Sequence, residues 1–162
     1  MKKISYLLFS IIFITNIYSC SGYKPIFSSS NLNFEITNYS IKGDKRIGRQ
    51  IYSKLKYLSQ ANDNTPGTKK IYIEINTLKN KVATAKNSAG KILGYRIDLS
   101  TEILVKNDKT NEQIFSENFS HSSSYKVQDQ HSETINLENN SIENLIDITY
   151  QDLVLKLSEN II

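Results

Sequence analysis

Three segments of the chain alternate apolar and polar residues with a period of two, at residues 32–41, 71–75 and 92–106. This period places successive side chains on opposite faces of an extended backbone, which is typical of a half-buried strand. The third segment shows the pattern most clearly, because one of its faces carries only aliphatic residues, tyrosine and threonine. These residues are Tyr95, Ile97, Leu99, Thr101, Ile103 and Val105. We therefore expect three strands, the first of which ends near Ile41.

A fourth strand is expected over residues 113–127, where Phe115, Phe119 and Tyr125 fall at positions of one parity. The polar turn at residues 107–112 is too short for a crossover between parallel strands. The third and fourth strands should therefore form an antiparallel hairpin.

Apolar residues recur at steps of three and four in two other segments, which is typical of amphipathic helices. The residues are Ile47, Ile51, Leu55 and Leu58 in the first segment, and Ile142, Ile146, Tyr150, Leu153, Leu157 and Ile161 in the second. Asp44 is placed to cap the first helix, which should end within residues 60–68. Asn140 or Ser141 is placed to cap the second helix. The polar residues 128–138 are expected to form a loop.

The order of elements is therefore strand, helix, three strands and helix. A sheet with one polar face, covered on its other face by both helices, buries every apolar stripe at once. We predict an α+β fold, in which a mostly antiparallel four-stranded sheet and two helices form a two-layer sandwich. Residues 32–162 should form this single domain.

The N-terminus has the features of an export signal. A short basic region precedes an apolar run that is shorter than the roughly 20 residues of a bilayer span. The run ends in Ile17-Tyr18-Ser19-Cys20, which resembles the lipobox of bacterial lipoproteins. We expect residues 1–19 to be a signal peptide, Cys20 to be lipidated, and residues 20–31 to form a flexible tether. The alternatives are an ordinary exported protein with an incidental cysteine and an uncleaved anchor helix.

Composition narrows the possible classes of function. The chain has 162 residues, of which 39% are hydrophobic and 22% charged, which suits one core and is too polar for a multi-span membrane protein. Removal of Lys2 and Lys3 with the signal leaves 18 basic and 16 acidic residues, so the net charge falls from +4 to +2. This near balance does not favour a nucleic-acid-binding protein.

The residues also lack the motifs of catalytic and metal sites. His121 and His131 are the only histidines and have no metal-ligand spacing. The serines form no GxSxG nucleophile motif, and no glycine-rich phosphate loop is present. Asp98 and Glu102 share a strand face, where we expect them to be solvated. We therefore expect a protein that is not an enzyme and that uses no cofactor or metal ion.

One local charge feature stands out between the second and third strands. No acidic residue occurs between Ile75 and Ile97, whereas Leu78 and Val82 fall out of phase with the preceding strand. A bulge, or a hairpin that projects beyond the core, would explain this change of phase. Unopposed cations on such a hairpin would suit a phosphate-bearing partner, although a lysine-rich loop that only keeps the protein soluble is the alternative. The five cations are Lys79, Lys81, Lys86, Lys91 and Arg96.

The start of the mature chain and the order of elements resemble the lipopolysaccharide-assembly lipoprotein family, LptE. In the N-terminal part, the resemblance rests on Cys20 and the residues that follow it. In the third strand, it rests on the tyrosine and alternating aliphatic residues of Gly94–Ser100. Ser21 is an insertion relative to the family pattern. The matching residues after the cysteine are Gly22, Tyr23, Pro25, Ile26 and Phe27.

This resemblance implies a non-enzymatic lipoprotein of the outer membrane. Members of the family sit in the lumen of the lipopolysaccharide-translocon β-barrel LptD, assist its assembly, plug it, and bind lipopolysaccharide during its insertion into the outer leaflet. By the resemblance, Cys20 would anchor the protein so that it faces the periplasm and the barrel lumen. The five cations would contact the phosphates of lipid A. Ser21 after the cysteine, in place of aspartate, favours the outer membrane over the inner one.

Two other functions remain open at this point. The first is an accessory lipoprotein of another envelope lipid-transport or efflux complex, which would copurify with a periplasmic or inner-membrane transporter. The second is a periplasmic module that binds a small apolar ligand. Such a module needs a closed cavity, whereas a plug needs a filled core and a broad polar surface.

Overall fold

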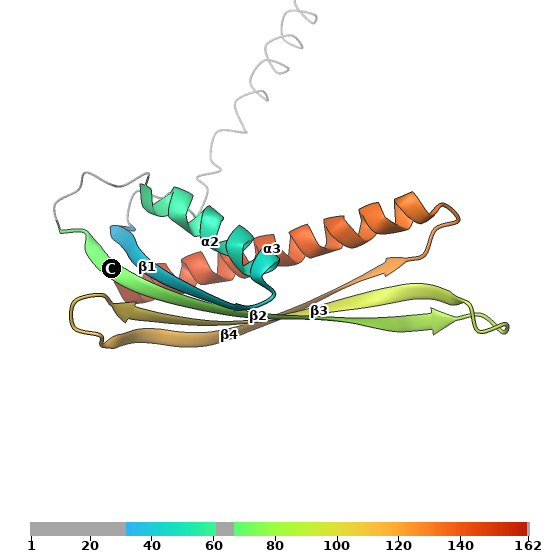
Figure 1. The fold of residues 1–162 in the computed structure, drawn as a ribbon, viewed down its shortest axis with the longest axis horizontal. Helices are drawn as coiled ribbons and strands as arrows, with labels where there is room; N and C mark the ends of the chain where they lie inside the picture. Colours follow the sequence, from blue (N-terminus) through green and yellow to red (C-terminus); the bar gives the residue numbers. More distant parts are fainter. Residues whose placement is uncertain (1–31, 61–66, 162) are drawn as a thin grey trace, which may run out of the picture.

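The computed structural model describes residues 32–60 and 67–161, which form one sheet covered by one layer of helices (Figure 1). The expected signal peptide, Cys20 and the tether lie outside the described residues. Within them, neither helix combines the length and the apolar character needed to cross a membrane. The elements are β1 (Phe34–Gly43), α2 (Lys45–Gln60), β2 (Lys69–Lys86), β3 (Ile92–Asn107), β4 (Gln113–Lys126) and α3 (His131–Ile161).

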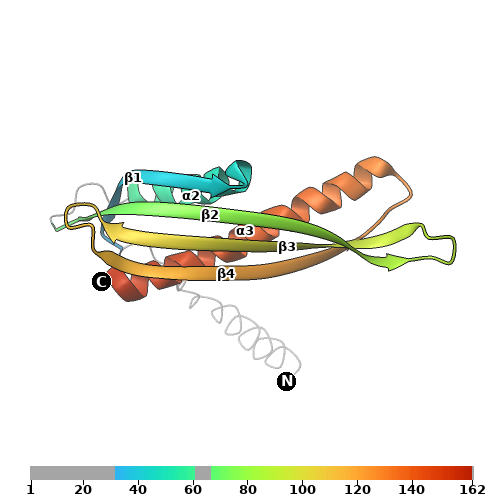
Figure 2. The same ribbon diagram turned by 60° about the horizontal axis from the view of Figure 1, so that its bottom comes forward.

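The strands form one mixed sheet in the order β1-β2-β3-β4. β1 and β2 are parallel, and the other two pairings are antiparallel. Both helices cover the same side of the sheet, here called the helix-facing face, and leave the opposite outer face uncovered by the described residues (Figures 1 and 2). The predicted fold class and order of elements are confirmed.

The core lies between the sheet and the helices and is rich in isoleucine. The alternation in the strands turns the apolar side chains toward α2 and α3, as the sequence pattern predicts. Burial of one such side chain contributes about 1.5–3 kcal/mol, so the apolar layer fixes both the register of the strands and the position of the helices. The side chains that are almost completely buried include Phe34, Ile47, Ile51, Leu55, Ile71, Ile73, Ile75, Ile103, Leu145 and Ile146.

The junction between β1 and α2 is set by two adjacent residues. Asp44 caps the helix as predicted, since its Oδ1 accepts hydrogen bonds from the backbone N–H groups of Arg46 at 3.1 Å and Ile47 at 3.2 Å. Gly43 has a φ of +70°, and a Cβ at this position would lie 1.9 Å from the carbonyl oxygen of Thr77. Only glycine fits this sharp exit from the sheet. The turn ends the pairing of β1 at Thr77, halfway along β2.

Helix α3 begins much earlier than its apolar stripe indicates. It starts at His131, so the expected loop over residues 128–138 and the expected cap at Asn140 or Ser141 are wrong. The first turns are held by polar contacts, which hydrophobic periodicity does not register. The hydroxyl oxygen of Thr134 accepts a hydrogen bond from the backbone N–H of Gln128 at 2.9 Å.

Strand β2 continues unbroken through the segment where its alternation changes phase. Thr77 is completely buried, whereas the side chain of Leu78 is 70% exposed and that of Val82 is 40% exposed. The two aliphatic residues therefore belong to the outer face, and the irregularities of the β2–β3 pairing come later, at Ala83 and Ala85. The hairpin of β2 and β3 does project beyond the other strands (Figure 2). The change of phase thus reflects exposed apolar side chains on a regular strand.

Candidate functional site

The projecting end of the β2–β3 hairpin closes in a tight turn that orients its two lysines. Asn87 organises the turn, since its side-chain Oδ1 accepts hydrogen bonds from the backbone N–H groups of Ala89 at 3.0 Å and Lys91 at 2.9 Å. Gly90 has a φ of +79°, a conformation that glycine adopts without strain. Lys86 and Lys91, both exposed, flank this turn.

The structure distributes the five predicted cations over three places. By alternation from the buried Thr77, Lys79 and Lys81 lie on the helix-facing face of β2. Arg96 lies on the outer face of β3, in register with Val82. The remaining two lysines lie at the tip of the hairpin. The five cations therefore do not share one face, although all belong to the same half of the hairpin.

Lys81 links the sheet to α3 through an ion pair and an aromatic contact. Its Nζ lies 2.5 Å from Glu138 Oε2 and 4.2 Å from the centre of the Tyr95 ring. The hydroxyl of Tyr125 donates a hydrogen bond of 2.9 Å to the same oxygen of Glu138. We call these four residues the Lys81 clasp. The clasp connects the polar start of α3 to the hairpin.

The clasp perturbs the pKa values of its two charged members in opposite directions. Burial disfavours the charged form of Lys81, but hydrogen bonds and attraction from Glu138 and Tyr125 outweigh it and raise the pKa of Lys81. Burial likewise opposes the charged form of Glu138, yet the hydrogen bonds from Lys81 and Tyr125 and the attraction of Lys81 and Lys79 lower its pKa. Both groups are therefore held in the charged form at neutral pH.

Arg96 is paired as well, on the other side of the sheet. Its Nε lies 2.9 Å from Asp98 Oδ1, and Ser122 donates a 2.6 Å hydrogen bond to the same oxygen. The hydrogen bonds from Ser122 and Arg96 lower the pKa of Asp98. The cation that would face a ligand on the outer surface thus already has an anion beside it.

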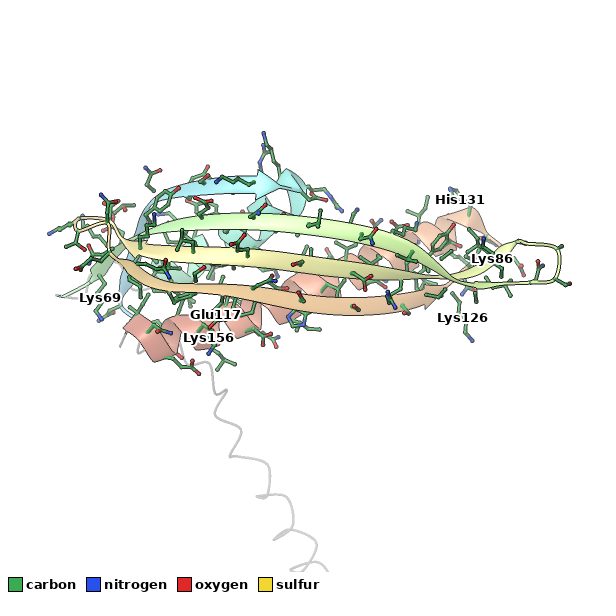
Figure 3. The ribbon with its side chains drawn as sticks, turned by 90° about the horizontal axis from the view of Figure 1, so that it is seen from below. Lys69, Lys86, Glu117, Lys126, His131 and Lys156 are labelled. Carbon is green, nitrogen blue, oxygen red and sulfur yellow. The ribbon has the colours of Figure 1, made fainter. Side chains whose placement is uncertain are left out.

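Three of the five cations, Lys79, Lys86 and Lys91, form no ion pair within the described residues, although Lys79 lies close enough to Glu138 to attract it. Lys126 joins them at the base of the hairpin, because the antiparallel register pairs it with Gly94. The sequence offered no signal for Lys126, which lies far from the basic window along the chain. Figure 3 shows Lys86 and Lys126 at this end of the molecule, which is also the end where α3 starts at His131.

A hollow of about 680 Å³ lies at the base of the hairpin, beside Lys126. It is open to solvent and mainly apolar, so a hydrocarbon group with an anionic head would match both its lining and its rim. The hollow is lined by Thr84, Ala85, Leu93, Gly94, Ser124, Tyr125, Lys126 and Val127.

The outer face of the sheet is mainly polar, and several of its charged residues are paired with one another. Along β4 it presents an uninterrupted row of small polar side chains, and a second open hollow of about 490 Å³ lies around Leu78, Asn80 and Arg96. Such a face can form hydrogen bonds to water or to another polar surface over its whole length. The row consists of Ser116, Asn118, Ser120, Ser122 and Ser124.

The two histidines lie apart from each other. Nε2 of His121 is buried and lies 3.1 Å from Asp152 Oδ2, without the alignment of a hydrogen bond. His131 is exposed at the start of α3. Among the side chains of residues 32–59 and 67–161, no group of three or more metal-binding residues comes together.

Comparison with known proteins shows structural likeness without sequence matches. No protein-family model and no curated protein sequence matches the chain. Uncharacterized lipoprotein B from Nitrosomonas europaea superposes with a TM-score of 0.57 at 14% identity, over 82% of this chain and 88% of that one. A minor lipoprotein from Acinetobacter baumannii superposes with a TM-score of 0.55 at 12% identity, over 80% of this chain and 94% of the other. At these identities, the likeness establishes that the domain has the fold of these two proteins.

Proposed function

We propose that this protein is a lipoprotein of the outer membrane that assists the assembly of, and plugs, the lipopolysaccharide-translocon β-barrel LptD. The observation that carries the proposal is the fold shared with two lipoproteins over about four fifths of the chain. It agrees with Cys20 at the end of a lipobox-like signal. The polar outer face would suit the wet lumen of a barrel.

The proposal gives the hairpin a role in contact with lipopolysaccharide. Lys86 and Lys91 at the tip would meet phosphate groups, and Lys79 and Lys126 would add to the field around the hairpin base. The apolar hollow between the strands would accommodate part of an acyl chain. Lys81 and Arg96 would act indirectly, because Glu138 and Asp98 already pair with them. No residue of this site would have a catalytic role, and no cofactor is needed.

Anchoring and partnership are tested together on the full chain in its bacterial host. Mass spectrometry of the mature protein should find acyl chains on Cys20, and Cys20→Ser should release the protein from the outer-membrane fraction, whereas Ser21→Ala should not. A photo-crosslinking amino acid at Ser120, on the outer face, should form adducts with a very large β-barrel protein. Adducts with a periplasmic or inner-membrane transporter would instead support an accessory subunit of another lipid-transport or efflux complex.

The contact with lipopolysaccharide is tested separately by charge removal. Replacement of Lys86, Lys91 and Lys126 by Gln should weaken binding to lipopolysaccharide vesicles by about tenfold or more, since each surface charge contact contributes up to about 1 kcal/mol. The control replaces two lysines by Gln, Lys106 and Lys109 at the opposite turn of the sheet, and should change binding little; the pair Lys86→Gln, Lys91→Gln is its match in charge. Equal effects of the two variants would contradict a specific role of the hairpin.

A further inference from the structure

The edge of β2 is left open along the second half of the strand. β1 pairs only with residues Lys69–Thr77 of β2, and Gly43 then turns the chain out of the sheet. From Leu78 onward, β2 pairs only with β3 within the described residues. Figure 2 shows this edge running past the end of β1 toward the tip of the hairpin. Unpaired backbone N–H and C=O groups along such an edge are a template for another strand.

Part of this edge is regular, and lysine, which usually blocks unspecific strand addition, occurs only on its helix-facing side. Bulges occur only at Ala83 and Ala85, so the segment Leu78–Val82 is regular. Its two lysines point to the helix-facing side, where Lys81 is held by Glu138. On the outer side, Leu78 and Val82 are both substantially exposed and stand next to the edge. Exposed aliphatic side chains beside an unpaired edge mark a site of interaction.

The helix-facing side of the edge carries several cations beside two carboxylates, those of Asp44, which caps α2, and Glu138, which pairs with Lys81. The first turn of α2 stands directly at the point where the edge opens, because the N–H of Asp44 donates a 2.8 Å hydrogen bond to the carbonyl of Thr77. Lys45 and Arg46 in this turn are exposed and, within the described part of the chain, form no ion pair. Together with Lys79 they flank the first positions that an added strand would occupy.

We propose that the edge segment Leu78–Val82 is a docking site for an extended, acidic segment of a partner protein, which adds to the sheet as a strand beside β2. Side chains of the added strand alternate between the two faces. Those on the outer side pack beside Leu78 and Val82 and are aliphatic. Those on the helix-facing side are Asp or Glu and meet Lys79 and the cations of the first turn of α2. This inference stands on the strand edge and does not depend on lipopolysaccharide binding.

A second copy of the chain fits the same edge poorly. Antiparallel pairing of two such edges would bring Lys79 and Lys81 of one copy toward the same lysines of the other. Like charges opposite each other destabilise strand pairing. The lysines of this edge therefore favour a partner of opposite charge.

The test uses the full-length lipidated protein in detergent micelles and two synthetic peptides. The first peptide has nine residues that alternate Val and Glu, and the second has Lys in place of every Glu. Hydrogen exchange of the amides in residues 78–82 that face the open edge, those of Lys79 and Lys81 by alternation from Thr77, should slow by about tenfold or more with a saturating amount of the Glu peptide. The Lys peptide should leave exchange unchanged.

Matched variants separate edge pairing from a general effect of charge. The double variant Leu78→Lys, Val82→Lys should weaken binding of the labelled Glu peptide by about tenfold, as measured by fluorescence anisotropy. Ser120→Lys with Ser124→Lys places the same charges on the same face of another strand and should leave binding unchanged. Lys45→Glu with Lys79→Glu should shift the preference toward the Lys peptide. Circular dichroism should show that all variants remain folded, since each replaced side chain is largely on the surface.

Three results would overturn the proposal. The first is exchange of the Lys79 and Lys81 amides that neither peptide slows. The second is equal binding of the two peptides, which would remove the role of the cations. The third is protection of the same amides that grows with protein concentration without peptide, which would identify a second copy as the occupant.

Discussion

The half of the molecule that holds β1 and α2 is built differently from the half that ends in the projecting hairpin. In the first half, the side chains of Ile71, Ile73 and Ile75 of β2 point into the buried apolar layer beneath α2. In the second half, the same face of the same strand carries Lys79 and Lys81, and α3 is connected to it by the Lys81 clasp. The comparison shows that one strand can pass from an apolar core to a polar clasp without a break in its pairing.

The largest expected effect on stability compares one buried and one exposed residue of β2. Ile73→Ala removes a completely buried side chain and should lower the free energy of unfolding by about 3–4 kcal/mol, from lost transfer energy and the cavity left behind. Leu78→Ala, on the outer face, should change it by no more than about 0.5 kcal/mol. Urea unfolding monitored by circular dichroism measures both. A similar loss of unfolding free energy in the two variants would contradict the division between a buried and an exposed part of β2.

The sequence predicted the apolar half well because packing there follows hydrophobic periodicity. The first, third and fourth strands, the first helix, its cap at Asp44, and the turn before β4 were placed close to their observed positions. The second strand was expected over residues 71–75 only, and its outer half up to Lys86 was not predicted as a regular strand. The parallel neighbours β1 and β2 follow from the crossover through α2. These features depend on local patterns and on the direction in which each apolar stripe points.

The polar half was predicted less well because polar contacts, which the hydrophobic pattern does not mark, hold it together. The first turns of α3 are held by a polar contact of Thr134 with the nearby Gln128, and by Glu138, whose partner Lys81 is distant in sequence. Hydrophobic periodicity registers neither contact. The cations of the candidate site were found as a group, but composition could not show that Glu138 and Asp98 neutralise two of them. Lys126 was missed because only the β3–β4 register brings it to the hairpin.

A second prediction concerns Gly43, where the two halves meet. Gly43→Ala should destabilise the fold by about 2–3 kcal/mol, because it adds the strain of a left-handed backbone and disrupts the hydrogen bond between Asp44 and Thr77. Gly90→Ala is the control, since its φ is also positive but a Cβ there would meet no atom within 4 Å. It should cost only about 1 kcal/mol. Equal losses in thermal and urea unfolding would show that the contact with β2 adds nothing at Gly43.

A third prediction concerns the coupling free energy between Lys81 and Glu138 in the clasp. Both charged side chains remain partly exposed, so solvent screening limits the coupling of Lys81 and Glu138 to about 0.5–1 kcal/mol. A double-mutant cycle with Lys81→Met and Glu138→Gln measures this coupling, because methionine keeps an aliphatic stem over the ring of Tyr95. The surface pair of Lys156 and Glu159 is the control and should give about 0.3 kcal/mol.

The clasp should also be visible in hydrogen exchange. If it holds the start of α3, Glu138→Gln should speed exchange of the amides from His131 to Glu138 more than those of the apolar second half of the helix. A uniform change along α3, or a coupling no larger than that of the control pair, would contradict the role of the clasp in joining the two layers.

The smallest effect is a dependence on pH that belongs to the polar half alone. The pKa of Glu138 is lowered below its ordinary value of 4.5, since the hydrogen bonds and charge of its partners outweigh burial. A group with a lowered pKa in the folded state contributes its stabilisation fully above the unfolded-state pKa and loses it as the pH falls through the folded-state value. The difference in unfolding free energy between the wild type and Glu138→Gln should therefore be constant from pH 7 to about 5.5 and shrink by up to about 1 kcal/mol toward pH 3.

Urea unfolding of both proteins at matched pH measures this difference, and the loss caused by Ile73→Ala should stay the same across the range because no charge is involved. A difference between wild type and Glu138→Gln that does not change with pH would show that shape and hydrogen bonding, rather than the carboxylate charge, hold the helix to the hairpin.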